Sequence, residues 1–380
     1  MWSVPGIRVL AAMTVFGFAG YAVLLPVAPL WAVRGGAGEA GAGLVNFVLL
    51  AATVATQTAV PRLLHRFGWS AVLGSGLALM GIGAVAQPVS DALPAILALA
   101  AVRGAGFGIL TVTGSAAAGL LVEPGRRGAA IGAYGLAVAL PNLVLLPLGP
   151  LVVAEGGFTL MFLIAGLPLL GVPLAPALAR HLQGDEDDAQ TAGGRPDRAL
   201  IPPAAILLGV TLAGGAIITF APQIVDAPVT ATWGLFLLGL VAALSRWRAG
   251  ALADRHGPGP FLAPLVGVTV VAMAAVAFAV RTPEHTAIFL AACALLGLSY
   301  GALQNLTLVL ALASVPRSRT HTASAVWNIG FDAGTALGSV LVGMIAAGVG
   351  FPTAMLAAGL LSLPTLPLAL RARSVGSPGR

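Results

Sequence analysis

Long apolar stretches, separated by short polar segments, run through the whole chain. A helix needs roughly 18 to 20 consecutive apolar residues to cross about 30 Å of hydrocarbon. Stretches of about that length predict twelve membrane spans, at approximately residues 7–33, 42–64, 71–90, 93–122, 129–154, 158–179, 200–225, 230–244, 261–280, 286–314, 322–347 and 352–370. The pattern therefore predicts an all-α integral membrane protein.

One longer polar segment divides these spans into two sets of six. It contains the acidic residues 185–188 and the flexible residues 191–194. An acidic run can bind a cation, but no turn glycine or further ligand stands at coordinating spacing, which favours a solvated linker. We expect an N-terminal six-helix bundle at residues 1–180, a cytoplasmic linker at 181–199 and a C-terminal six-helix bundle at 200–380, related by pseudo-symmetry.

Composition agrees with a membrane protein and excludes several other classes. Hydrophobic residues make up 58% of the 380 residues and charged residues only 8%, with a mean hydropathy of +0.98, whereas soluble proteins carry about 25% charged residues. The net charge of +6 comes from scattered Arg, which does not form a basic face for nucleic acid. We expect the lipid bilayer as surroundings and no nucleic-acid partner.

The distribution of Arg predicts the orientation in the membrane. If the connections alternate between two sides, 16 of the 19 Arg fall on one side, Arg34 and Arg281 on the other, and Arg103 within the fourth span. Because positive residues collect in cytoplasmic connections, we expect both termini in the cytoplasm of a multi-pass plasma-membrane protein.

Two octets stand at corresponding places in the two halves, after the second and eighth spans. The second reads Gly-Ala-Leu-Ala-Asp-Arg-His-Gly at 250–257, and the first reads Pro-Arg-Leu-Leu-His-Arg-Phe-Gly at 61–68. Both are expected in loops. They resemble the Gly-x-Leu-Ala-Asp-Arg-x-Gly signature of the major facilitator superfamily, although the first octet has Pro61 and His65 in place of Gly and Asp.

This resemblance implies a cytoplasmic gate that is closed when the pore faces outward. The residues that match the gate are Gly250, Asp254, Arg255 and Gly257, with Arg66 and Gly68 in the first half. A carboxylate can bind the exposed N–H groups at a helix start, so we expect Asp254 to meet residues 126–128 at the start of the fifth span. His65 supplies no fixed negative charge, which predicts a weaker gate in the first half.

Other segments extend the resemblance over nearly the whole chain. Residues 103–108 are similar to the family's Arg-x-x-x-Gly element, and residues 324–338 to the eleventh span of exporter-like members. The fifth span resembles the Gly-Pro motif of antiporters without its compact form. Together these features resemble the twelve-span drug/proton antiporter group. Gly330, Gly334 and Gly338 share one helix face and predict close packing on a partner helix.

The resemblance also indicates which residues line a central cavity. The candidates are Tyr21, Arg103, Gln304, Asn305 and Asn328. Each uncharged one can instead form an ordinary hydrogen bond between helices. A mostly apolar cavity with a few polar groups favours a small hydrophobic or amphipathic substrate.

Arg103 and Asp332 are the two formal charges that the predicted spans bury near mid-membrane. A charge there costs at least about 2.5 kcal/mol and usually serves a transport pathway. We interpret both as proton-coupling residues, with Asp332 as the proton carrier. The alternative is that each only braces its own bundle.

The sequence thus predicts a secondary active transporter, a proton-coupled exporter that acts as a monomer by alternating access. Uptake or exchange of a nutrient-like solute is the alternative, as is a non-transporting membrane sensor. No triad, metal-binding cluster or phosphate-binding loop with Lys is visible, and the single Cys293 cannot form a disulfide within the chain. We therefore expect no enzyme activity, no cofactor and no metal.

Overall fold

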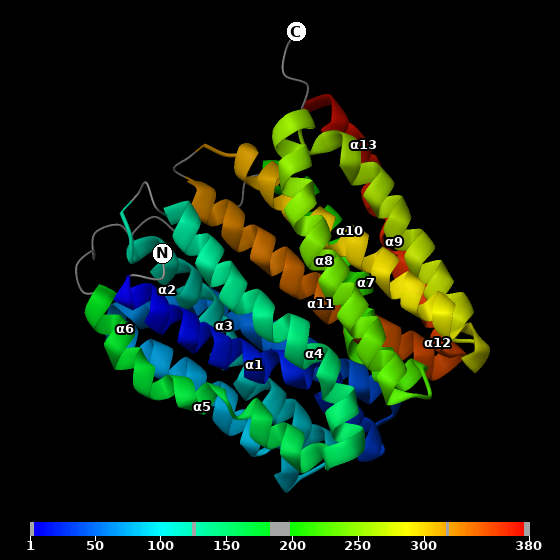
Figure 1. Cartoon of the computed structure of the whole chain (residues 1–380), viewed down its shortest axis with the longest axis horizontal. Coiled ribbons are helices and arrows are strands. Elements are labelled where there is room, and N and C mark those ends of the chain that lie inside the picture. The colour runs from blue at the N-terminus through cyan, green and yellow to red at the C-terminus, as the bar shows by residue number, and fades with distance from the viewer. Residues whose placement is uncertain (1–3, 124–126, 183–197, 317–318, 376–380) are drawn as a thin grey trace. The chain divides into compact units, whose positions relative to one another are not determined.

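The structure is a computed structural model that describes residues 4–123, 127–182, 198–316 and 319–375. The side chains of residues 127–129, 131, 132, 254, 283, 320, 321 and 373–375 lie outside this description, as do the predicted linker residues 183–197. The described residues form helices and short connections without a strand (Figure 1). The all-α fold is as expected.

The chain forms two compact units. One consists of Met1–Ala37 and Val48–Thr191, and the other of Gly38–Phe47 and Ala192–Arg380. The helices up to residue 182 are α1 (Pro5–Arg34), α2 (Gly38–Val85), α3 (Leu93–Leu120), α4 (Arg127–Ala165), α5 (Pro168–Gly171) and α6 (Ala175–Leu182). Those after residue 198 are α7 (Ile201–Ile224), α8 (Pro228–His256), α9 (Gly259–Ala279), α10 (Thr286–Ala313), α11 (Thr320–Val349), α12 (Phe351–Leu360) and α13 (Leu366–Val375). The first turns of α2, residues 38–47, are thus part of the second unit.

Ten helical stretches of the described chain are long and apolar enough to cross a membrane. Two of them, Gly38–Val89 and Ala133–Leu182, are 52 and 50 residues long, about twice the length that one crossing requires. Each is interrupted in its interior by a glycine with non-helical backbone angles, Gly68 in α2 and Gly157 in α4. The count of twelve crossings stays a prediction, and these two glycines are where the long stretches would divide.

Four helix-to-helix turns share one backbone conformation. Gly68 has φ 72° and ψ 169°, and Gly257, at the end of α8, has φ 73° and ψ 163°. Gly157 and Gly350 form a second such pair, with φ 79° and 84°. Only glycine adopts these angles readily. The last residue of each signature octet therefore permits the sharp turn between two antiparallel helices.

Gly257→Ala and Gly68→Ala are each expected to lower the free energy of unfolding by about 1–3 kcal/mol, because a Cβ atom strains this conformation. Thermal unfolding in detergent measures the effect. Gly267→Ala is the matched control, since Gly267 is helical and a Cβ atom there meets nothing within 4 Å. Equal melting temperatures for all three variants would contradict the conformational requirement.

Three predicted spans differ from the helices that form. The predicted span 158–179 is divided among the end of α4, α5, a 3₁₀ turn and α6, and the span 352–370 among α12, a 3₁₀ turn and α13. Prolines at 168 and 173, and at 364 and 367, explain both interruptions, because proline lacks the N–H that continues a helix. The predicted span 230–244 covers only part of a longer helix, because α8 continues for twelve residues beyond Leu244.

Glycines allow close packing of helices within the second unit. A Cβ atom on Gly334 or Gly338 of α11 would collide with the backbone of α7 at Leu208 or Leu212. Gly330 lies on the same face, near Ala204 of α7. The expected packing face on α11 is confirmed, and its partner is α7.

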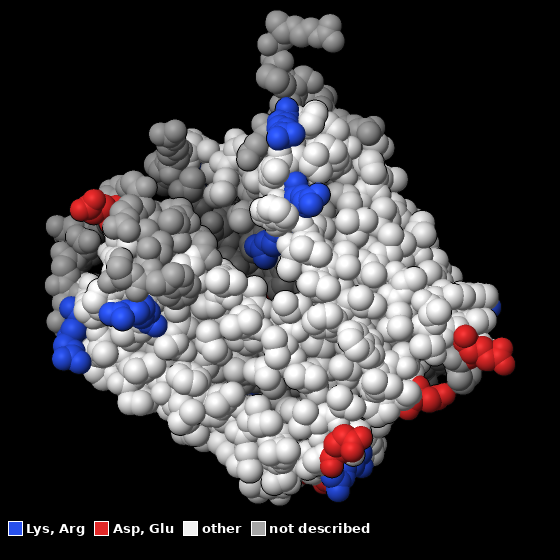
Figure 2. Space-filling model, viewed as in Figure 1, with Lys and Arg blue, Asp and Glu red and all other residues white. Residues whose placement is uncertain are grey.

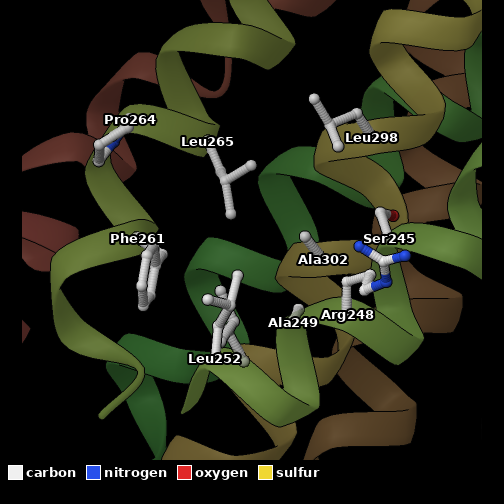
Figure 3. Close-up of a pocket in the computed structure, with 10 residues that line it drawn as sticks. Ser245, Arg248, Ala249, Leu252, Phe261, Pro264, Leu265, Leu298 and Ala302 are labelled. Carbon is white, nitrogen blue, oxygen red and sulfur yellow. The ribbon is translucent and has the colours of Figure 1, made fainter. Parts of the chain in front are cut away.

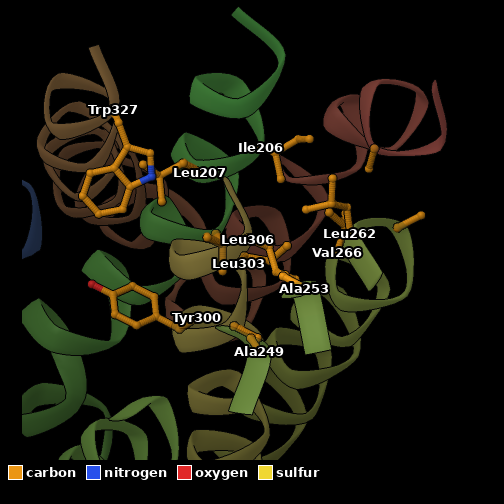
Figure 4. Packing of buried hydrophobic residues seen from close by; sticks show 14 residues of the cluster. Ile206, Leu207, Ala249, Ala253, Leu262, Val266, Tyr300, Leu303, Leu306 and Trp327 are labelled. Atoms are coloured by element: carbon orange, nitrogen blue, oxygen red, sulfur yellow. The ribbon is translucent and has the colours of Figure 1, made fainter. Parts of the chain in front are cut away.

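Exposed surface and buried core both suit a lipid environment. Figure 2 shows broad stretches of surface without a charged side chain. In the second unit a buried apolar cluster joins α7 to α11, and Figure 4 shows Leu303 and Leu306 of α10 at its centre. This cluster fixes the face of α10 that carries Tyr300 and Gln304.

Candidate functional site

Arg103 lies in the interior of the first unit. It stands ten residues after the start of α3, about 15 Å along the helix, and its side chain is only 3% exposed. The stem packs against Gly83 of α2. Both terminal guanidinium nitrogens are buried and have no hydrogen-bond partner among the described residues. Arg103 is therefore a buried cation whose charge the described part of its own unit does not neutralise.

The described acidic residues of the first unit lie at its surface. Asp91, Glu123 and Glu155 are the acids described there, and all three are exposed. Among all described residues, Arg103 and Asp332 are the only buried charged side chains. The two charges selected from the sequence are thus the ones that the structure buries.

An aromatic group lies close to Arg103. Tyr21 of α1 is buried and stacks on Phe107 of α3, with ring centroids 3.8 Å apart and an angle of 4° between the planes. Phe18 packs edge-on against Phe107 at 5.2 Å. Tyr21 is also close enough to Arg103 for an electrostatic interaction. Two of the predicted cavity residues, Tyr21 and Arg103, therefore belong to one cluster.

Glycines next to Arg103 hold α3 against α2. A Cβ atom on Gly104 would collide with Leu49 of α2, and one on Gly108 would lie 2.6 Å from the carbonyl oxygen of Thr53. The Thr53 hydroxyl donates to the carbonyl oxygen of Gly104 at 3.0 Å. The glycines in the segment 103–108 therefore allow close packing of α3 on α2. This packing fixes the position of Arg103 relative to α2.

Asp332 is the buried charge of the second unit. It lies twelve residues after the start of α11, about 18 Å along the helix, and is 6% exposed. Tyr300 of α10 is close enough to interact electrostatically with it. The Tyr300 ring packs on Gly214 of α7 and lies 6.2 Å from the ring of Phe331. A carboxylate and a phenol thus share the interior of this unit.

Arg246 joins this cluster, which the sequence did not predict. Its Nη1 donates a hydrogen bond to Oε1 of Gln304 at 3.2 Å, and it is also within electrostatic range of Tyr300. The predicted span 230–244 ends two residues before Arg246, because the apolar run of α8 ends there. The helix continues for ten residues to His256, about 15 Å. That distance before the glycine turn is the signal that could have placed Arg246 beside α10.

The remaining predicted cavity residues have different surroundings. Gln304 is buried and accepts the bond from Arg246. Asn305 faces Gly250 of α8, and its Oδ1 atom is buried without a hydrogen-bond partner in the described structure. Asn328 is exposed, and its side chain donates to the backbone oxygen of Ser324 in its own helix at 2.9 Å. Gln304 therefore belongs to the charged cluster, whereas the described bond of Asn328 is local.

The signature octets do not lie in loops, which corrects that expectation. Residues 250–256 form the last two turns of α8, and residues 61–67 continue α2 up to Gly68. Ala, Leu and Arg favour helix, so each helix continues until its glycine. Arg66 and Arg255 are exposed at these two ends, and Arg66 lies over the ring of Phe67 at 5.2 Å.

The predicted partners of Asp254 fall outside the described part of the chain. Asp254 is helical, but its side chain is not described, and the same holds for the side chain of Arg127. Arg126 lies outside the described residues altogether. The gate formed by these residues stays a prediction.

Asp254→Asn is expected to reduce transport far more than His65→Ala, because only Asp254 places a fixed negative charge near a helix end. Interactions of about 0.3–2 kcal/mol with a helix start shift a two-state balance from about twofold to about 30-fold. Initial transport rates at matched membrane abundance measure the difference. Equal rates in the two variants would rule out an asymmetric gate.

The fold, the buried charges and the paired octets define a membrane transporter. The sequence profile of the Major Facilitator Superfamily matches residues 10–334, and the chain belongs to this family. It is a secondary transporter and not an enzyme, with a small molecule as substrate. No curated protein sequence matches the chain.

Solved transporters share the fold at low sequence identity. A bacterial homolog of the human lysosomal transporter Spinster, in an inward-facing and unoccupied conformation, has a TM-score of 0.79 and 14% identity over 98% of each chain. The occupied form of such a homolog has a TM-score of 0.76 and 18% identity, again over 98% of each chain. A variant of the nucleoside transporter NupG has a TM-score of 0.70 and 12% identity, covering 97% of this chain and 99% of its own. These similarities show the fold.

Proposed function

We propose that the protein exports a small hydrophobic or amphipathic compound in exchange for protons, by alternating access. In this proposal it belongs to the drug/proton antiporter group and works as a monomer in the plasma membrane. Both termini lie in the cytoplasm, as the distribution of Arg predicts.

The single observation that carries proton coupling is the buried Asp332 with its neighbours. A carboxylate deep in a membrane-spanning helix is costly unless it is used or paired. Tyr300 lies near it, and Arg246 of α8 lies near Tyr300. A cation close to a carboxylate favours its charged form. Movement of α8 or α10 relative to α11 would change this electrostatic environment and so couple proton uptake and release to conformation.

The character of the substrate follows from the residues around the two charges. Tyr21, Phe18 and Phe107 offer aromatic surface near Arg103, and Gln304 and Tyr300 offer hydrogen-bonding groups in the second unit. Binding sites for small organic molecules are mostly apolar with a few placed polar groups. In each unit by itself, apolar surroundings with a few polar groups support an amphipathic ligand better than a strongly hydrated one.

Proteoliposomes with an imposed pH gradient test the proposal. Purified protein is reconstituted, and a panel of radiolabelled or fluorescent amphipathic compounds is compared with nutrient-like solutes. We expect an amphipathic compound to be moved against its gradient, in the direction opposite to the proton flow. Movement of a nutrient-like solute in the same direction as the protons would support uptake instead. Substrate binding without any movement would support the sensor.

A further inference from the structure

A groove opens between α8, α9 and α10 of the second unit, apart from the buried charges. Its volume is about 230 Å³. Figure 3 shows Phe261 and Leu265 of α9 facing Leu252 and Arg248 of α8 across it. Pockets for drug-sized ligands usually measure about 300–1,000 Å³. The groove therefore suits part of a long molecule better than a whole compact one.

The third wall of the groove is a straight apolar stripe on α10. Leu298, Ala302 and Leu306 line it at intervals of four residues, so they lie on one helix face and extend about 12 Å along the axis. One leaflet of a bilayer has a hydrocarbon depth of about 15 Å, half of the ~30 Å core. The stripe thus extends over most of the hydrocarbon depth of one leaflet.

The mouth of the groove is turned toward the surroundings of the unit. Leu252 and Leu298 in its lining are 42% and 40% exposed. Leu244 and Trp247, on the adjacent surface of α8, are 52% and 68% exposed. In a membrane-spanning helix, exposed apolar side chains of this kind contact lipid. A lipid chain can therefore enter the groove directly from the bilayer.

Arg248 gives the groove its charge. It is the only charged residue among the described residues of the lining, and none of these is an acid. Its guanidinium carbon lies 5.2 Å from the centre of the Trp247 ring, and Trp is typical of the membrane interface. An anion beside Arg248 therefore meets positive charge next to an apolar surface.

We propose that this groove is a binding site for an anionic phospholipid, with an acyl chain along the stripe on α10 and the phosphate paired with Arg248. The apolar lining accounts for the chain, and the guanidinium accounts for the headgroup. Guanidinium groups form strong charge-assisted hydrogen bonds with phosphate oxygens. The bound lipid would pack against α8 and α9 next to the turn at Gly257, independently of which substrate the transporter carries.

Native mass spectrometry of the purified full-length protein in detergent tests the site. The protein is titrated with palmitoyl-oleoyl phosphatidylglycerol and, separately, with phosphatidylcholine of the same chains. We expect one retained phosphatidylglycerol at concentrations where phosphatidylcholine is not retained. Arg248→Gln should weaken phosphatidylglycerol binding about fivefold, the effect of one basic residue near an anionic lipid. Arg255→Gln is the matched control, with an exposed Arg on the same helix outside the lining, and should change binding less than twofold.

A second variant tests the position of the acyl chain. Leu298→Trp places a larger side chain at the mouth of the groove and, because Leu298 is 40% exposed, does not disturb a packed interior. Its elution in size-exclusion chromatography checks its folding. We expect it to weaken phosphatidylglycerol binding as well. Equal affinity of the unchanged protein for the two lipids, equal losses in the Arg248 and Arg255 variants, or full binding by Leu298→Trp would each overturn the proposal.

Discussion

Asp332→Asn is expected to abolish transport driven by a pH gradient. The variant should still exchange substrate across a membrane that has no pH gradient. The amide has nearly the shape of the carboxyl group but cannot release a proton. Coupling through this residue therefore stops, whereas substrate binding and the movement between conformations continue. Proteoliposomes with and without a pH gradient measure the two activities on one preparation.

Asp226→Asn is the matched control for this variant. Asp226 belongs to the same unit and has the same functional group, but it is exposed before the start of α8. We expect it to retain both activities. If the Asp332 variant still concentrates substrate at the expense of a proton gradient, the assignment is wrong and coupling resides elsewhere or is absent.

Much of the fold could be predicted because lipid restricts what the chain can do. Backbone groups in hydrocarbon must be satisfied internally, so a long apolar run such as 93–122 has to be helical, and α3 forms within it. Helix ends were harder to predict. The apolar run of α8 ends at Leu244, but the helix ends at His256, because residues with high helix propensity continue past the end of the apolar run.

In other places hydropathy predicts one long helix where the chain forms several short ones. Residues 158–179 are apolar throughout, yet Pro168 and Pro173 divide them among several short elements. Hydropathy does not register the missing N–H group of proline. The glycine at the end of each signature octet was recognised from the sequence, but its conformation, with positive φ in both Gly68 and Gly257, is visible only in three dimensions.

Candidate site residues could be predicted where a charge stood alone in an apolar run. Arg103 and Asp332 satisfied that condition, and both are buried. Arg246 stands beside Trp247 and Arg248, two residues beyond the predicted span 230–244, so hydropathy does not mark it as a buried charge. Only the pairing of α8 with α10 shows that Arg246 bonds Gln304 whereas Arg248 faces the groove. Neighbours along a helix point in different directions, and hydropathy averaged over a window cannot separate them.

Arg103→Ala is expected to reduce both proton-driven transport and substrate exchange. Arg103→Met distinguishes loss of the positive charge from loss of side-chain packing as the cause. Met keeps an apolar stem against Gly83 and removes the charge, whose terminal nitrogens have no described hydrogen-bond partner. Because a buried charge without a partner costs free energy, the Met variant should unfold at the same or a higher temperature although it does not transport. Arg180→Ala, at an exposed Arg of the same unit outside both octets, should leave transport unchanged. Normal transport by the Met variant would exclude a functional charge, and a lower melting temperature together with lost transport would show that Arg103 only braces the bundle.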